Sequence, residues 1–137
     1  MEMTRRRMNL NILLKLQILY GCLSLAFLFT SGWYARTTGE ALSAAPVAPS
    51  AVMFLVYLGC LLIPKYGKTG WYRAMMALAI VPFGIGGVLM NILNYVQNGL
   101  RDYSSFGVFC IAVGINLFGT IWNIAAVAGL FEKSENA

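Results

Sequence analysis

Histidine is absent from the 137-residue chain, and charged side chains make up only 11% of it. Without imidazole the chain lacks the usual general base, the commonest metal ligand and the histidine ligand of haem. The few acidic residues all fall in segments that we expect to be loops or tails: Glu2, Glu40, Asp102, Glu132 and Glu135. A catalytic nucleophile needs a base within hydrogen-bond reach, and Ser24 and Thr30 have none nearby in sequence. We therefore expect no enzyme, no cofactor and no metal site.

The scarcity of charge has a second consequence for the class of protein. Hydrophobic residues make up 59% of the sequence, against about 45–50% in ordinary soluble domains, which also carry about 25% charged residues. A soluble fold this small must cover a large surface with polar groups, and this sequence has too few. We predict a single membrane domain over residues 1–137, with lipid as its solvent.

Four apolar runs are long enough to be considered as membrane spans, because crossing the hydrocarbon core takes about 20 residues. They cover residues 12–34, 47–63, 71–95 and 106–131. The predicted fold is therefore an all-α integral membrane protein, a bundle of four transmembrane helices with short loops. The first run follows three arginines like a signal peptide, but it exceeds the 7–15 residues typical of one, so we predict a retained helix. A kink is expected near Pro82.

The basic residues predict the orientation of these spans, since cytoplasmic loops carry an excess of Lys and Arg. Eight of the ten basic residues fall on one side and two on the other, Arg36 and Arg101. Both termini and the middle loop are thus predicted to be cytoplasmic, most simply in a bacterial inner membrane. Six basic residues are expected to contact anionic lipid headgroups and fix the topology: Arg5, Arg6, Arg7, Lys65, Lys68 and Arg73. They form no basic stripe with interleaved aromatics, so we expect no nucleic-acid partner.

The three cysteines do not predict a disulfide framework. Cys22, Cys60 and Cys110 each lie inside an apolar run, and their odd count argues against paired disulfides. We expect them to be small buried or lipid-facing side chains.

The most informative pattern is a stripe of small and amide residues on the third and fourth runs. On the third run Gly84, Gly87, Asn91 and Asn94 follow steps of 3, 4 and 3, which places them on one α-helical face. On the fourth run the same spacing joins Ala112, Asn116, Gly119, Asn123 and Ala126. We define the Asn/Gly seam as the following residues: Gly84, Gly87, Asn91, Asn94, Asn116, Gly119 and Asn123. A weaker stripe on the first run, Gln17, Gly21 and Ser24, is expected to face the same interior.

The Asn/Gly seam has three interpretations. The first interpretation is a tightly packed helical hairpin, because small residues let backbones approach and Asn side chains form hydrogen bonds between helices in lipid. The seam is alternatively the lining of a polar path, or a surface for another protein's helix. Intramembrane carboxylates and bases usually mark ion-coupled transporters, and this chain has none in mid-span. A catalytic pair of Glu40 and Asp102 is explained better as unrelated loop acids.

These observations predict a non-enzymatic membrane protein that acts through helix contacts, as an accessory subunit, an assembly or regulatory factor, or an immunity-type protein. Its expected partners are the lipid bilayer and either another membrane protein or further copies of itself. The alternative function is a small oligomeric channel or transporter with a neutral path along the Asn/Gly seam.

Overall fold

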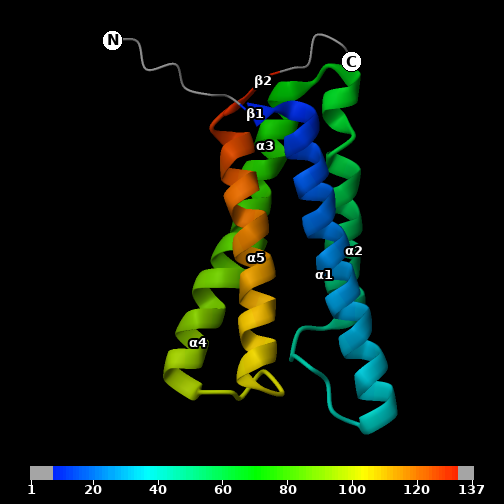
Figure 1. Ribbon diagram of the computed structural model, residues 1–137, viewed down its shortest axis with the longest axis vertical. Helices are drawn as coiled ribbons and strands as arrows, with labels where there is room; N and C mark the ends of the chain where they lie inside the picture. The colour runs from blue at the N-terminus through cyan, green and yellow to red at the C-terminus, as the bar shows by residue number, and fades with distance from the viewer. Residues whose placement is uncertain (1–7, 133–137) are drawn as a thin grey trace.

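The computed structural model describes residues 8–132, so Arg5, Arg6 and Arg7 lie outside the described residues. Four helical segments in it are long and apolar enough to cross a membrane, as the sequence predicts. They are α1 (Leu10–Thr38), α2 (Val47–Cys60) with the short helix η1 (Ile63–Tyr66), the continuous run α3 (Thr69–Ala79), η2 (Ile80–Met90) and α4 (Asn91–Asn98), and α5 (Phe106–Val127). All four run side by side along the long axis of the molecule (Figure 1).

The helix ends are marked by capping side chains and by a glycine with positive φ, and they do not coincide with the ends of the apolar runs. The Asn9 side chain caps α1 by accepting from the Asn11 amide at 2.8 Å, and Ser105 caps α5 in the same way. The first span continues four residues past its predicted end, and in its last turn the Thr38 hydroxyl donates to the Tyr34 carbonyl at 2.7 Å. It ends where Gly39 adopts a positive φ of 82°.

The second span is longer than predicted. The sequence predicted a run of residues 47–63, whereas α2 and η1 together form a helical segment of 20 residues, Val47–Tyr66. Pro64 can continue the chain as a 3₁₀ turn because it lies in the first turn of η1, where its missing N–H is not needed. This span is therefore no shorter than the thickness of a membrane core requires.

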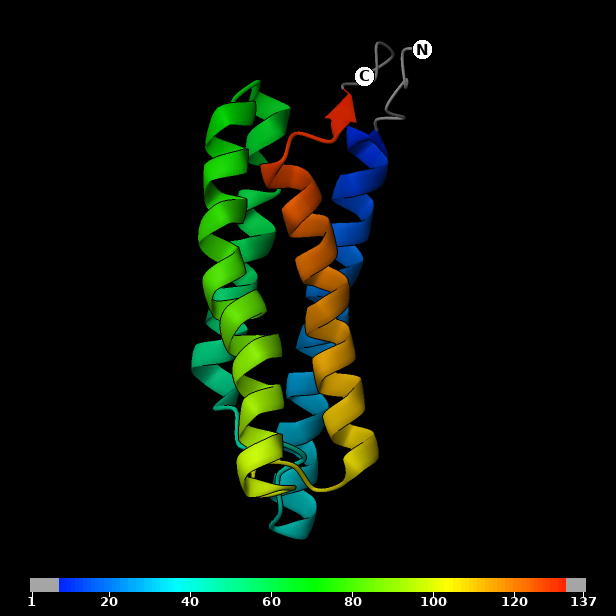
Figure 2. The same cartoon turned by 90° about the vertical axis from the view of Figure 1, so that its left-hand side faces the viewer.

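The middle of the third span is a π-helix of 11 residues, η2. Pro82 lies near its start and cannot donate to the preceding turn, and π-helical turns are one way in which such a break is accommodated. The wider turn changes which residues share a face, so the α-helical spacing assumed for Gly84, Gly87 and Asn91 does not hold exactly here. Beyond η2 the chain leans away from α5, and α4 buries no residue (Figures 1 and 2).

Each end of the molecule is closed by paired backbone. At the loop end, the segments 39–46 and 99–105 meet in an antiparallel bridge between Ser43 and Tyr103. At the terminal end, β1 (Met8–Asn9) pairs in parallel with β2 (Phe131–Glu132), with Met8 opposite Phe131. The fourth span therefore ends at Val127 and not at the predicted Phe131, and Gly129 turns the chain with a φ of 71°.

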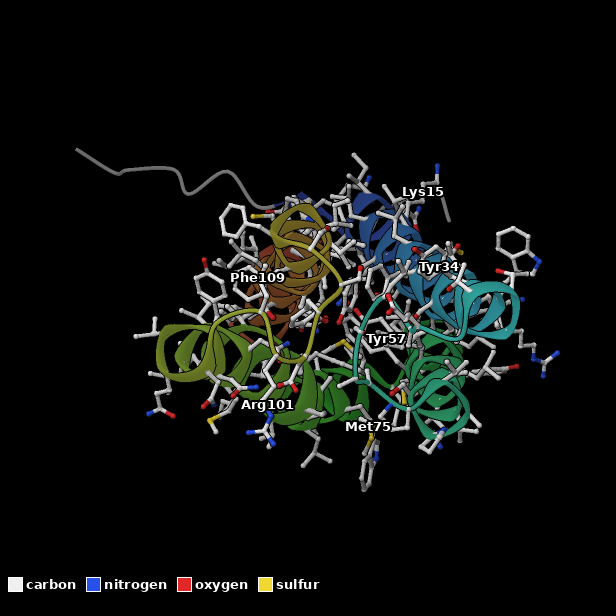
Figure 3. The ribbon with its side chains drawn as sticks, turned by 90° about the horizontal axis from the view of Figure 1, so that it is seen from below. Lys15, Tyr34, Tyr57, Met75, Arg101 and Phe109 are labelled. Atoms are coloured by element: carbon white, nitrogen blue, oxygen red, sulfur yellow. The ribbon has the colours of Figure 1, made fainter. Side chains whose placement is uncertain are left out.

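Helices α1 and α5 pack against each other at the centre of the molecule: α1 also contacts α2, and α5 also contacts α3 and η2. The largest fully buried side chains are polar or aromatic as well as apolar: Tyr20, Tyr72, Leu13, Met76, Gln17, Asn123 and Ser31. Figure 3, seen from the loop end, places Tyr57 between the helices and Lys15 and Arg101 at the periphery. The interior thus contains a polar layer as well as an apolar core.

Candidate functional site

A hydrogen-bonded cluster from all four spans lies in the half of the interior nearer the terminal end. Gln17 of α1 donates to the Asn123 Oδ1 of α5 at 3.0 Å and to the Met76 sulfur at 3.1 Å. Tyr57 of α2 donates to the same Asn123 oxygen at 2.6 Å, and Tyr72 of α3 donates to the side-chain oxygen Oε1 of Gln17. Because Gln17 and Asn123 are fully buried, these bonds replace water that the interior excludes.

An aromatic layer follows toward the loop end. The rings of Phe54 and Phe83 are stacked at 4.5 Å, and the Tyr20 ring meets both edge-on at 5.6 and 5.9 Å. Tyr57 joins the layer through Tyr20 and Phe83. Such edge-on pairs are favourable arrangements of aromatic quadrupoles. The layer closes the interior between the hydrogen-bonded cluster and the loop end.

Asn116 connects this layer to the third span. It accepts a hydrogen bond from the Tyr20 hydroxyl at 3.0 Å and donates to the Gly87 carbonyl at 3.4 Å. A Cβ on Gly87 would lie 2.7 Å from the Asn116 Cγ, so only glycine allows this approach. Asn91 donates to the same Gly87 carbonyl at 2.9 Å and thus bonds within its own helix.

Gly84 also lies against the fourth span, whereas Gly119 and Asn94 face other elements than the spacing suggested. Gly84 lies against Thr120 of α5, because a Cβ on Gly84 would be 3.1 Å from the Thr120 Cγ2 atom. Gly119 faces the Tyr20 ring of α1 and not the third span. Asn94 donates to the Asp102 carboxylate in the segment 99–105. The helix η2 is wider than an α-helix, and α1 inserts Tyr20 against α5, so one continuous contact line between two spans does not form.

A cavity of about 440 Å³ occupies the half of the interior nearer the loop end. All four spans and both loop-end segments line it. Its polar lining includes Ser24, Ser43, Asn91, Asn116 and Asp102, while Phe54 and Phe83 of the aromatic layer form its floor. Only part of the Asn/Gly seam reaches it, because Asn123 is bonded beneath the floor. The cavity is a polar and aromatic chamber rather than a groove along two helices.

Exposed lining residues show where the cavity opens. Met53 on α2 and Pro82 on η2 are exposed at the side, and Ala44 and Ala45 are exposed in the loop-end segment. The cavity is thus partly open to its surroundings, and these four residues lie at its exposed parts.

Two buried serines in the lining lack hydrogen-bond partners. Ser24 and Ser43 are 4% and 6% exposed, and neither side-chain oxygen has a partner. Buried hydroxyls without partners are uncommon in native interiors, and a bound molecule is one explanation for them. Three other buried polar atoms of the described residues, in Thr120, Trp122 and Asn123, also lack partners, but only the two serines line the cavity. There a water or a ligand can bond to them, and this position favours a ligand-binding site.

Asp102 is the one charged side chain of the lining, a role that the sequence pattern did not indicate because Asp102 stands in a predicted loop. Its carboxylate accepts from Asn94, and its backbone carbonyl accepts from the Ala44 amide at 2.8 Å. Burial and the Asp102 charge raise the pKa of the neighbouring Tyr103 phenol. Among residues 8–132, no cluster of His, Cys, Asp or Glu could hold a metal ion.

The basic residues singled out from sequence lie near the terminal end where they are described. Arg73 donates two hydrogen bonds to the Val127 carbonyl, at 3.0 and 2.7 Å. A cation at the carboxyl end of α5 complements the helix dipole, so Arg73 has a packing role besides any contact with lipid. Lys65 and Lys68 are exposed beside η1.

Comparisons of the chain with protein families, curated proteins and solved structures give no significant match.

Proposed function

We propose that the protein is an integral membrane protein that binds a small molecule in the loop-end cavity and catalyses no reaction. The observation that carries this proposal is the chamber of about 440 Å³ with two unpartnered buried hydroxyls in its lining. Ligand pockets typically measure about 300–1,000 Å³ and combine apolar walls with a few polar groups. The mixture of aromatic rings, amides and serines here has that composition.

The proposed orientation keeps both termini in the cytoplasm of a bacterial cell and opens the cavity to the outside. Lys65, Lys68 and Arg73 lie toward the terminal end, and Arg36 and Arg101 lie toward the loop end. That distribution supports the positive-inside argument made from the sequence. A ligand would then reach the cavity from the extracytoplasmic water or from the outer leaflet.

Uptake or export of the ligand is an extension of this proposal. The aromatic layer and the hydrogen-bonded cluster close the cavity toward the terminal end, so passage would require Phe54 and Phe83 to separate. The cavity lies within one chain, and the ligand site itself therefore does not need an oligomer.

A second candidate function is docking of another membrane protein, or of a second copy, as an accessory or regulatory subunit. It is favoured by α4, which buries none of its residues and exposes Leu93 and Val96 at 51% and 74%. Lipid contact alone also explains such apolar exposure. We therefore rank docking second to ligand binding.

The proposal is tested with the full chain in lipid nanodiscs and a panel of small amphiphiles that are cationic, neutral or anionic. Ligands that bind the folded state should raise the unfolding temperature of the wild type. Ala112→Phe fills the cavity from α5, because Ala112 is buried in its lining. Gly114→Phe is the matched control, since nothing lies within 4 Å of a Cβ there.

We expect at least one compound to stabilise the wild type and Gly114→Phe but not Ala112→Phe. Equal stabilisation of both variants, or none of the wild type, would refute ligand binding in the cavity. If ligand binding were refuted in this way and a stoichiometric membrane partner were recovered from native membranes, docking would be the supported function.

A further inference from the structure

The charge and shape of the cavity lining indicate the class of ligand. We propose that the cavity accepts a small organic cation, an amine or quaternary ammonium attached to an apolar group, with Asp102 as its counter-ion. This inference rests on the proposed function, because it names the ligand of the same cavity.

Asp102 is positioned as a fixed negative charge. The Asn94 amide donates to its Oδ2 atom, and the Ala44 amide holds its backbone carbonyl at 2.8 Å. Together these bonds fix the segment 99–105 and the side chain that projects from it. Asp102 is only half buried, so its carboxylate lies where a cation could enter from the loop end.

Basic side chains do not compete for this position in the cavity lining, which holds none. Arg101, the next residue in sequence, is exposed and lies outside the cavity lining. With Glu40 it lines an adjoining surface hollow, and that hollow shares Asp102 and Tyr103 with the cavity. A ligand cation would therefore supply the positive charge that the lining lacks, whereas an anion would be repelled by Asp102.

The walls suit the apolar part of such a molecule. Phe27, Phe54, Phe83 and Tyr103 contribute aromatic surfaces around the chamber, and a cation over an aromatic face is stabilised by the ring quadrupole. The hydroxyls of Ser24 and Ser43, which lack partners, provide acceptors for an N–H donor of an amine. Carboxylate, aromatic faces and acceptors together recognise a cation better than a neutral molecule of the same shape.

The test uses three probes of similar shape: phenyltrimethylammonium, its uncharged carbon analogue tert-butylbenzene, and the anion benzenesulfonate. Binding is measured by equilibrium dialysis against the full chain in phosphatidylcholine nanodiscs, with empty nanodiscs as the blank. The variant Asp102→Asn removes the charge but keeps the shape, and Asp102→Glu keeps the charge. Arg101→Ala is the control for a nearby change of charge, because Arg101 does not line the cavity.

We expect Asp102→Asn to weaken phenyltrimethylammonium binding at least about tenfold, as loss of a close charge pair does, and to leave tert-butylbenzene binding unchanged. Asp102→Glu and Arg101→Ala should keep cation binding, and benzenesulfonate should bind weakest. Thermal unfolding of each variant shows that it is folded. Equal binding of the cation and its carbon analogue, or an unchanged Asp102→Asn, would overturn the cation assignment while leaving the cavity as a ligand site. Failure of all three probes, together with failure of the amphiphile panel, would overturn both.

Discussion

The Tyr57 hydroxyl donates to the Asn123 side-chain oxygen at 2.6 Å, and Gln17 donates to that same oxygen at 3.0 Å. One amide of α5 thus accepts from both α1 and α2. Within a bilayer, apolar burial does not drive helices together, and association depends on packing and on interhelical hydrogen bonds. Asn123 therefore fixes the relative positions of three helices at one depth.

The two donors to Asn123 predict a graded effect on stability. Tyr57→Phe removes one donor and leaves Asn123 bonded to Gln17, so the loss should be about 0.6 kcal/mol. Asn123→Leu instead strands the buried Tyr57 hydroxyl and costs Gln17 one of its two acceptors, for a loss of about 1–3 kcal/mol. Thermal unfolding in detergent measures both. If Asn123→Leu were as mild as Tyr57→Phe, the shared acceptor would not stabilise the fold.

The sequence predicted the four apolar helices well because their signal is simple. Runs of about 20 apolar residues and clusters of polar residues between them are local properties. The ends were less accurate, since Thr38, Gly39 and Gly129 decide them through hydrogen bonds and positive φ angles that hydropathy does not include.

The interior was predicted only in part. Gln17 and Ser24 were assigned correctly to the inside by their spacing, but the partners of Gln17 were not identifiable. In sequence Tyr72 resembles an interfacial aromatic at the start of its span, and Tyr57 is one aromatic residue within an apolar run. Only the fold brings them to Gln17 and Asn123. A further obstacle was the π-helix, whose turn does not follow α-helical spacing.

Gly119 and Gly114 provide a matched pair on α5. A Cβ at Gly119 would overlap the Tyr20 ring, whereas nothing lies within 4 Å of one at Gly114. Gly119→Ala should therefore destabilise the protein by about 1–3 kcal/mol, the usual cost of overpacking, whereas Gly114→Ala should leave stability unchanged or raise it by up to about 1 kcal/mol, because alanine is the better helix former. Equal unfolding temperatures for the two variants would contradict the packing of Tyr20 against α5.

Substitutions at Gly87 and Gly86 distinguish an effect on helix packing from an effect on ligand binding. A side chain at Gly87 meets Asn116, while a Cβ at Gly86 has only the Val81 carbonyl of its own helix nearby, at 3.8 Å. We expect Gly87→Leu to lower the unfolding temperature more than Gly86→Leu does. Both glycines line the cavity, so Gly86→Leu should reduce binding of any stabilising compound while the fold persists. Equal stability of the two variants would show that η2 does not approach α5 at Gly87.

The bridge between Ser43 and Tyr103 predicts a disulfide that reports both loop pairing and topology. Bridged residues of antiparallel backbone have Cα atoms about 4.5–5.5 Å apart, within the range that a disulfide spans. Ser43→Cys with Tyr103→Cys, in a background where Cys22, Cys60 and Cys110 are replaced by alanine, should therefore crosslink. Glu40→Cys with Tyr103→Cys is the control, because Glu40 is outside the bridge.

Expression in a bacterium with an oxidising periplasm makes this crosslink a test of orientation, because thiols in the cytoplasm remain reduced. With the loop end outside, the Ser43/Tyr103 cysteine pair should be oxidised in intact cells, as measured by alkylation before lysis and gel shift, and the Glu40 pair should remain largely reduced. If the Ser43/Tyr103 cysteine pair were reduced in cells but crosslinked on oxidation of the purified protein, the loop pairing would be supported and the proposed topology would be wrong. A pair that crosslinks under neither condition would instead remove the bridge, and with it the arrangement that brings Asp102 into the cavity wall.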